Sequence, residues 1–200
     1  MDSKKLTPLQ LDVLREVANI GAAHAATALS QIIEKTVLIN VTRVDLFPIN
    51  SVSEAFEDSE SRVVAVRLKM LGDAVGGFIL IWSWQDALTL AAILKKEPRR
   101  PPELSAMDIS ALKESGSILA AAYLRAIGDF IGFSIIPAVP ELFHGEIAEV
   151  LERTIGELSR RSELAFCLET EFIDSKNQLR GRFLLVPDVK GLQMILGKLL

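Results

Sequence analysis

The second half of the chain repeats the first, and this internal repeat restricts the folds open to the sequence. Glu16 in the first half falls on Glu114 in the second. Three longer stretches align in the same way: 11–16 with 109–114, 36–42 with 134–140 and, at a slightly larger offset, 76–81 with 181–186. A repeated supersecondary unit that shares one core favours a duplicated molecule with pseudo-twofold symmetry. We therefore expect one domain made of two repeats, at about 7–97 and 104–200.

Each repeat has the pattern of a long helix, three strands and a shorter helix. Thr7, Pro8 and Gln10 form a capping-box pattern for the first long helix, and Ser105 begins the second in the same way. We expect these helices to end near Glu34 and Gly132. Apolar patterning and turn residues predict the other elements: strands at about 36–47, 62–71, 75–82, 134–139, 163–173 and 180–186, helices at about 84–96 and from about 188, a linker at about 95–102, and an amphipathic helical insertion within about 141–160. The expected class is α+β, an antiparallel sheet covered by long helices.

Composition and charge narrow the classes of function. Half of the 200 residues are hydrophobic and the net charge is −4, which gives no support for binding nucleic acid or an anionic membrane. The segment 1–6 is polar, and no apolar stretch reaches the ~18 residues of a membrane-spanning helix. Cys167 is the only cysteine, and it lies in an alternating run where it is expected to be a small core residue. A lone cysteine excludes an internal disulfide, so we expect a cytoplasmic protein.

One face of the first long helix carries polar groups at helical spacing. At about 100° per residue, Asp12, Glu16 and Asn19 share a face about 60° wide. Four small residues continue that face: Ala23, Ala26, Thr27 and Ser30. The opposite side is the expected core stripe: Leu14, Val17, Gly21, Ala25, Ala28, Leu29 and Ile32. A low strip of small side chains lets another protein approach closely, although an exposed alanine-rich face would look the same because Ala is the best helix former.

The second long helix repeats this arrangement with substitutions. Ser110, Glu114 and Ser117 occupy the corresponding face. A glutamate that occurs twice on a repeated polar face favours a functional role over a merely solvated surface, though shared ancestry alone would also produce it. In the first helix we expect Glu16 and Asn19 to project side by side into solvent.

These residues resemble the signature of the CheC family of chemotaxis phosphatases, which includes CheX and FliY. The family pattern is Asp or Ser, three residues, Glu, two residues, Asn, then 22 residues and Pro. The first half matches through Asp12, Glu16 and Asn19, but Thr42 stands where Pro is expected. The second half has Ser110, Glu114, Ser117 and Pro140, so Ser replaces the family Asn there. The resemblance covers nearly the whole chain.

The resemblance implies hydrolysis of the aspartyl-phosphate of a CheY-type response regulator. Asn19 would orient the attacking water and Glu16 would pair with a lysine of the regulator, while Asp12, Ala23 and Ser110 would contact the partner. Glu114 and Ser117 would form a second site that hydrolyses poorly, because Ser is shorter than Asn and lacks the amide donors. The family needs no cofactor of its own, since the regulator brings Mg²⁺.

Other readings stay open beside this one. A binding module of the same fold that has lost turnover would serve as an adaptor for the phosphorylated regulator or for CheD, and a structural component of the flagellar switch is a third reading. The segment 141–147, where CheC proteins bind CheD, departs from the apolar-plus-Asp pattern of that interaction.

His24 and His144 lack neighbours at metal-ligand spacing, so we expect no metal site. The segment 72–77 is expected to be a hairpin turn.

Overall fold

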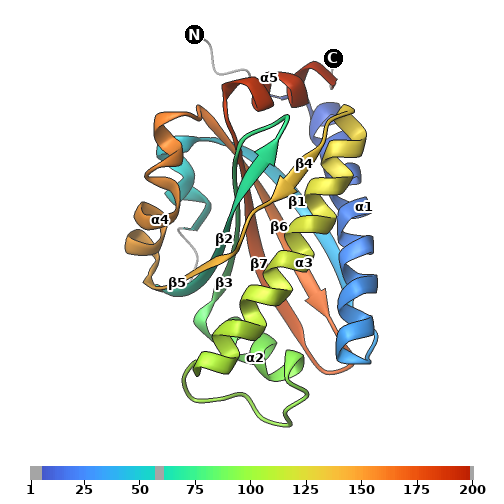
Figure 1. Ribbon diagram of the computed structural model, residues 1–200, viewed down its shortest axis with the longest axis vertical. Coiled ribbons are helices and arrows are strands. Elements are labelled where there is room, and N and C mark those ends of the chain that lie inside the picture. The colour runs from blue at the N-terminus through green and yellow to red at the C-terminus, as the bar shows by residue number, and fades with distance from the viewer. Residues whose placement is uncertain (1–5, 57–60, 199–200) are drawn as a thin grey trace.

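The computed structural model describes residues 6–56 and 61–198, which form an antiparallel sheet with helices on both faces (Figure 1). The long helices α1 (Pro8–Ile33) and α3 (Ala106–Ile131) lie side by side and run in opposite directions on one face. The shorter α4 (Ile147–Ile155) and the 3-10 helix η1 (Ile49–Phe56) cover part of the other face. Two further helices lie at opposite ends of the molecule: α2 (Trp84–Leu94) and α5 (Val189–Lys198). The expected α+β class is confirmed.

The sheet has seven strands in the described part of the chain, and their order reflects the repeat. Hydrogen-bonded neighbours follow the order β1-β6-β7-β3-β2-β4, and β5 also pairs with β2. The strands are β1 (Leu38–Pro48), β2 (Arg62–Gly72), β3 (Gly76–Ser83), β4 (Ile135–Pro137), β5 (Glu141–Glu146), β6 (Leu164–Ile173) and β7 (Gln178–Pro187). If β1 is exchanged with β4, β2 with β6 and β3 with β7, the same order is obtained, read from the opposite edge of the sheet. A pseudo-twofold axis therefore passes between β3 and β7, the pair at the centre of the sheet.

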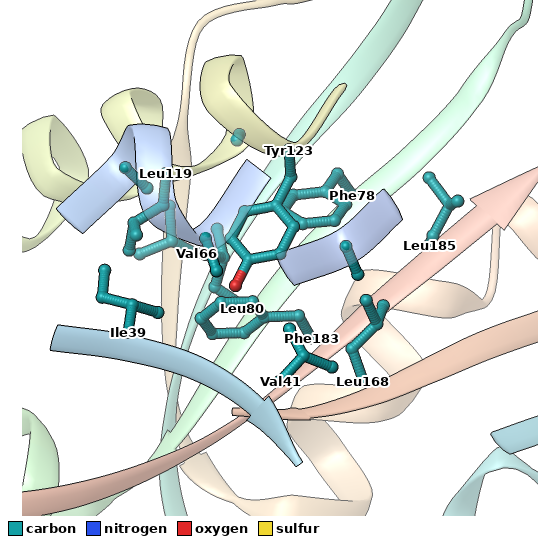
Figure 2. Close-up of a cluster of buried hydrophobic side chains, with 14 of the residues drawn as sticks. Ile39, Val41, Val66, Phe78, Leu80, Leu119, Tyr123, Leu168, Phe183 and Leu185 are labelled. Atoms are coloured by element: carbon teal, nitrogen blue, oxygen red, sulfur yellow. The ribbon is translucent and has the colours of Figure 1, made fainter. Parts of the chain in front are cut away.

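The main core lies between the α1/α3 layer and the sheet, around an aromatic cluster (Figure 2). Tyr123 of α3 is fully buried, with ring centroids 5.8 Å from Phe78 of β3 and 5.6 Å from Phe183 of β7. Gly21 is the point where α1 crosses α3, because a Cβ built there would lie 2.8 Å from Cα of Tyr123. The close crossing fixes the two helices against each other, and so fixes the polar face that each one presents.

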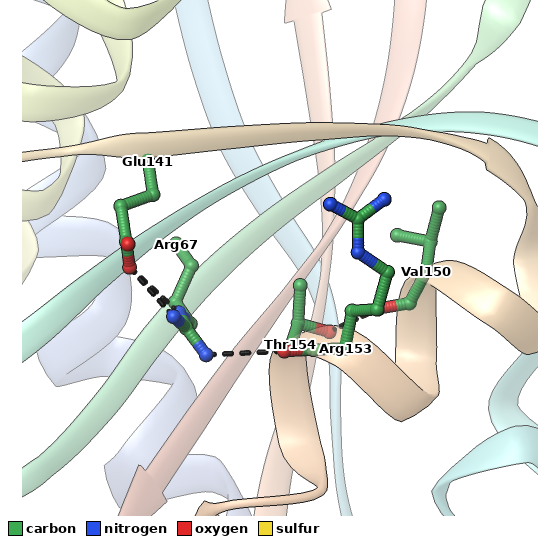
Figure 3. A network of polar contacts seen from close by, with 5 residues as sticks. All are labelled: Arg67, Glu141, Val150, Arg153 and Thr154. Atoms are coloured by element: carbon green, nitrogen blue, oxygen red, sulfur yellow. Dashed lines mark hydrogen bonds and ion pairs between the residues drawn. The ribbon is translucent and has the colours of Figure 1, made fainter.

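A charged network joins β2, β5 and α4 on the opposite face (Figure 3). The Arg67 side chain, only 10% exposed, donates to Oε2 of Glu141 over 2.6 and 3.1 Å and to the carbonyl of Arg153 over 3.1 Å. These bonds satisfy a guanidinium that would otherwise be buried without partners. The segment 141–146 was expected to belong to a helical insertion, but it forms β5 on β2, and only 147–155 is the amphipathic helix.

Candidate functional site

Glu16 lies on the outward face of α1, where the sequence placed it. The helix begins with the expected capping box, in which Thr7 Oγ1 accepts from the Gln10 amide and Gln10 Oε1 accepts from the Thr7 amide. Glu16 is exposed, and its carboxylate makes no hydrogen bond or ion pair with any residue in the described ranges. Asp12, one turn earlier, is also exposed but pairs with Arg15 at 3.0 Å. Glu16 is therefore available to a partner, whereas Asp12 already forms a surface ion pair with Arg15.

Asn19 is held against the sheet and does not extend into solvent beside Glu16. Its Oδ1 accepts from the Val41 amide at 2.9 Å, and its Nδ2 donates to the Arg15 carbonyl at 3.0 Å and to the Val41 carbonyl at 3.3 Å. The carboxamide is partly buried as a result. This differs from the expected placement, in which both side chains projected freely.

The difference arises because the core stripe of α1 is displaced toward β1. Ala26 was expected on the partner-facing strip but is buried, whereas Ile32 was expected in the core and is 50% exposed. Asn19 thus lies at the border of the core, next to the edge strand β1. Ser30 lies on the same border, where its Oγ accepts from the Val37 amide at 2.9 Å. Of the small strip, Ala23 and Thr27 remain exposed, beside a shallow groove between α1 and β1.

Thr42 occupies a β-bulge next to the residue that holds Asn19. Val41 pairs with Thr170 and Arg43 pairs with Glu169, so Thr42 is an extra residue in β1. Its hydroxyl donates to the Glu169 carbonyl at 3.3 Å. Bulges are positions where a strand tolerates Pro, because the amide is outside the regular ladder. The bulge therefore explains how one position can carry Pro in the family pattern and Thr in this chain.

The second half repeats the glutamate but not the anchored amide. Glu114 and Ser110 are exposed on α3, and no described residue hydrogen-bonds to the Ser117 hydroxyl. Between β4 and β5, Val139 is 81% exposed, whereas its counterpart Val41 is 4% exposed. The two sites are therefore built differently where the helix meets the strand.

Sequence reasoning did not identify Val41 and Arg15 as partners of Asn19. Both act through backbone groups, which any residue type supplies, so side-chain chemistry gives no signal for them. The one usable signal was the fixed spacing between Asn19 and position 42. That spacing links the polar face of α1 to one place on β1.

Several residues were given no role in this site on sequence grounds. His24 is exposed, and His144 packs against Trp84 with ring centroids 5.9 Å apart. Cys167 is buried as expected, and burial raises the pKa of its thiol to about 12.

Within 6–56 and 61–198, no three His, Cys, Asp or Glu side chains are grouped to hold a metal ion. None of the helices described here combines the length and the apolar character needed to cross a membrane.

Comparisons with known proteins agree with this architecture. The family model described as CheC-like family matches residues 9–41, the segment that runs from the start of α1 to Val41. A Bacillus subtilis (strain 168) protein, CheY-P phosphatase CheC, is 31% identical over 184 residues, which are 90% of this chain and 88% of the relative.

Two solved structures share the fold. The crystal structure of Thermotoga maritima FliY aligns with a TM-score of 0.80 and 17% identity over 97% of each chain. The CheX-CheY-BeF3-Mg²⁺ complex from Borrelia burgdorferi aligns with a TM-score of 0.52 and 18% identity, over 83% of this chain and 95% of that chain. The identity to the Bacillus protein extends through both repeats, and on that ground the chain belongs to the CheC-like family.

Proposed function

We propose that this protein hydrolyses the aspartyl-phosphate of a CheY-type response regulator in the cytoplasm. The observation that carries the proposal is Glu16, an exposed carboxylate without a partner among the described residues, one turn from Asn19 on a helix with small neighbours. The 31% identical Bacillus relative is named a CheY-P phosphatase, and a CheX of the same fold was solved bound to CheY with BeF3 and Mg²⁺.

The chemistry asked of the chain is modest. Phosphoryl transfer needs an in-line nucleophile and neutralisation of charge, and a response regulator would supply the Mg²⁺ and a lysine. Glu16 would pair with that lysine and fix the register of the two proteins. Asn19 would orient the attacking water. Water attacks phosphorus directly in this scheme, so no covalent intermediate forms on this chain.

The second site is proposed to bind a regulator and to hydrolyse poorly. Glu114 is exposed like Glu16, so a similar ion pair can form there. The Ser117 hydroxyl is shorter than a carboxamide and has no anchor on the neighbouring strand. Positioning of a water is therefore expected to be weak.

The test is the rate at which a phosphorylated CheY-type regulator loses its phosphate. Asn19→Ala is expected to lower the catalysed rate by about 100-fold, the loss typical of a displaced positioning group. Ser117→Ala is expected to keep a rate close to that of the unmutated protein. If Asn19→Ala kept the rate and Ser117→Ala lost it, the roles of the two sites would be reversed.

An adaptor role is the second candidate, and the contacts of Asn19 favour it. A carboxamide that already bonds to Val41 and Arg15 also has a purely structural explanation, namely protection of an edge strand. An adaptor would bind the phosphorylated regulator, or CheD through 141–147, without shortening the lifetime of the aspartyl-phosphate. If the protein bound the phosphorylated regulator without accelerating loss of its phosphate, the adaptor role would be favoured over the phosphatase.

A further inference from the structure

We infer that the outer edge of β1 positions Asn19 so that its carboxamide can act on a water only as a hydrogen-bond acceptor. This inference rests on the proposed phosphatase function and concerns the same site. It assigns a positioning role to the peptide group of Val41.

The bonding capacity of the carboxamide is almost filled. An Asn side chain has two N–H donors and an oxygen that accepts two hydrogen bonds. Both donors are taken, one by the Arg15 carbonyl at 3.0 Å and one by the Val41 carbonyl at 3.3 Å. The oxygen accepts once, from the Val41 amide at 2.9 Å. One acceptor position on Oδ1 is left over, and reversing the amide would set its oxygen against two carbonyl oxygens.

The position of Val41 at the edge of the sheet makes these contacts available. In an antiparallel pair, alternate residues turn their N–H and C=O away from the partner strand. Val41 therefore turns both groups away from β6 and toward α1. Ser30 uses Val37 in the same way, accepting at 2.9 Å and donating to its carbonyl at 3.4 Å. Val37 directly precedes β1, so the two sets of hydrogen bonds hold α1 against β1 at two places and fix the plane of the Asn19 amide.

The reaction needs an acceptor at this place. The water oxygen forms a bond to phosphorus while the bond from phosphorus to the aspartyl carboxylate oxygen breaks, and the bonding pair leaves on the carboxylate. Both protons of the water remain with the released inorganic phosphate. Before attack, the water must turn a lone pair toward phosphorus and point a hydrogen elsewhere, and the remaining acceptor position of Oδ1 receives that hydrogen bond. No described residue hydrogen-bonds to the Ser117 hydroxyl, so this hydroxyl can rotate and does not fix the orientation of a water.

Val41→Pro tests the inference because it deletes the amide that donates to Oδ1 and removes no ladder bond to β6. Ile39→Pro is the matched control. Ile39 lies two residues earlier with its amide also turned outward, it is buried to the same degree, and no described side chain bonds to it. We expect Val41→Pro to lower kcat about tenfold with KM unchanged, and Ile39→Pro to keep kcat. Equal kcat values in the two variants would overturn the positioning role, whereas no catalysed hydrolysis by the unmutated protein would refute the phosphatase itself.

A second measurement on the unmutated protein tests whether Asn19 keeps its hydrogen bonds to Val41 and Arg15 when a regulator binds. In the ¹⁵N-labelled protein, both Nδ2 protons of Asn19 are expected to be protected from exchange with solvent. They should stay protected when a CheY-type regulator activated with beryllofluoride and Mg²⁺ is added. Loss of that protection on binding would show that Asn19 leaves β1 to act, which contradicts the inference.

Discussion

Gly21→Ala tests the helix crossing that sets both polar faces. An added Cβ at position 21 would lie 2.8 Å from Cα of Tyr123 and 3.3 Å from the Ala122 carbonyl oxygen. Ordinary contact begins at 3.4 Å, and both obstacles are backbone atoms of α3, so the helices themselves must separate. Tyr123 cannot move easily, because its buried ring packs against the rings of Phe78 and Phe183.

The magnitude follows from two opposing effects. Overpacking a well-packed core costs about 1–3 kcal/mol, and the rigid neighbours place this site at about 3 kcal/mol. Replacing a helical Gly by Ala returns about 1 kcal/mol. The free energy of unfolding should therefore fall by about 2 kcal/mol, and Tm by about 4–8 °C for a domain of this size.

Urea and thermal unfolding of Gly21→Ala measure this loss directly. Gly197→Ala is the matched control, since it lies in α5 and an added Cβ there would meet nothing within 4 Å. Its stability should be unchanged or slightly raised. A Gly21→Ala protein as stable as the unmutated one would show that α1 and α3 do not cross as closely as described.

Two further predictions concern buried ionisable groups. Lys95→Met removes the cation 2.7 Å from the buried Asp108 carboxylate, whose pKa burial tends to raise but whose bonds to Lys95 and Ser105 bring below its usual value. A carboxyl group with a lowered folded-state pKa adds stability above about pH 4, and this stability is lost as the pH falls through that pKa. The variant should therefore be less stable near neutral pH, because the Asp108 carboxylate loses its cation, and it should unfold at higher pH in acid titrations. An unchanged acid midpoint would contradict the ion pair. Cys167, with a thiol pKa of about 12 caused by burial, should react with a thiol reagent at pH 8 only in denaturant, and fast reaction in the native protein would contradict its placement.

The repeat and the helix caps made most of the fold predictable from sequence. The N-cap residues Thr7 and Ser105 predict where the two long helices begin. Buried strands such as β2 and β3 read as apolar runs separated by a glycine-rich turn. The short strand β5 could not be predicted, since its side chains alternate weakly and its place depends on the open edge of β2 and on the pairing of Arg67 with Glu141.

The candidate site was only half predictable for a related reason. The exposure of Glu16 follows from the helical period alone, which can be read from the sequence. Asn19 depends on which side of α1 the edge strand approaches, and the periodicity of one helix does not contain that information. The displaced core stripe, with Ala26 buried and Ile32 exposed, is the consequence of tertiary packing by β1.

The most direct measurement of the central claim is single-turnover decay of a ³²P-labelled CheY-type regulator with and without this protein. The account predicts that the label is lost much faster in its presence, and that Asn19→Ala abolishes most of the difference while the protein still folds and binds. Identical decay curves with and without the unmutated protein, at concentrations where binding is demonstrated, would contradict it.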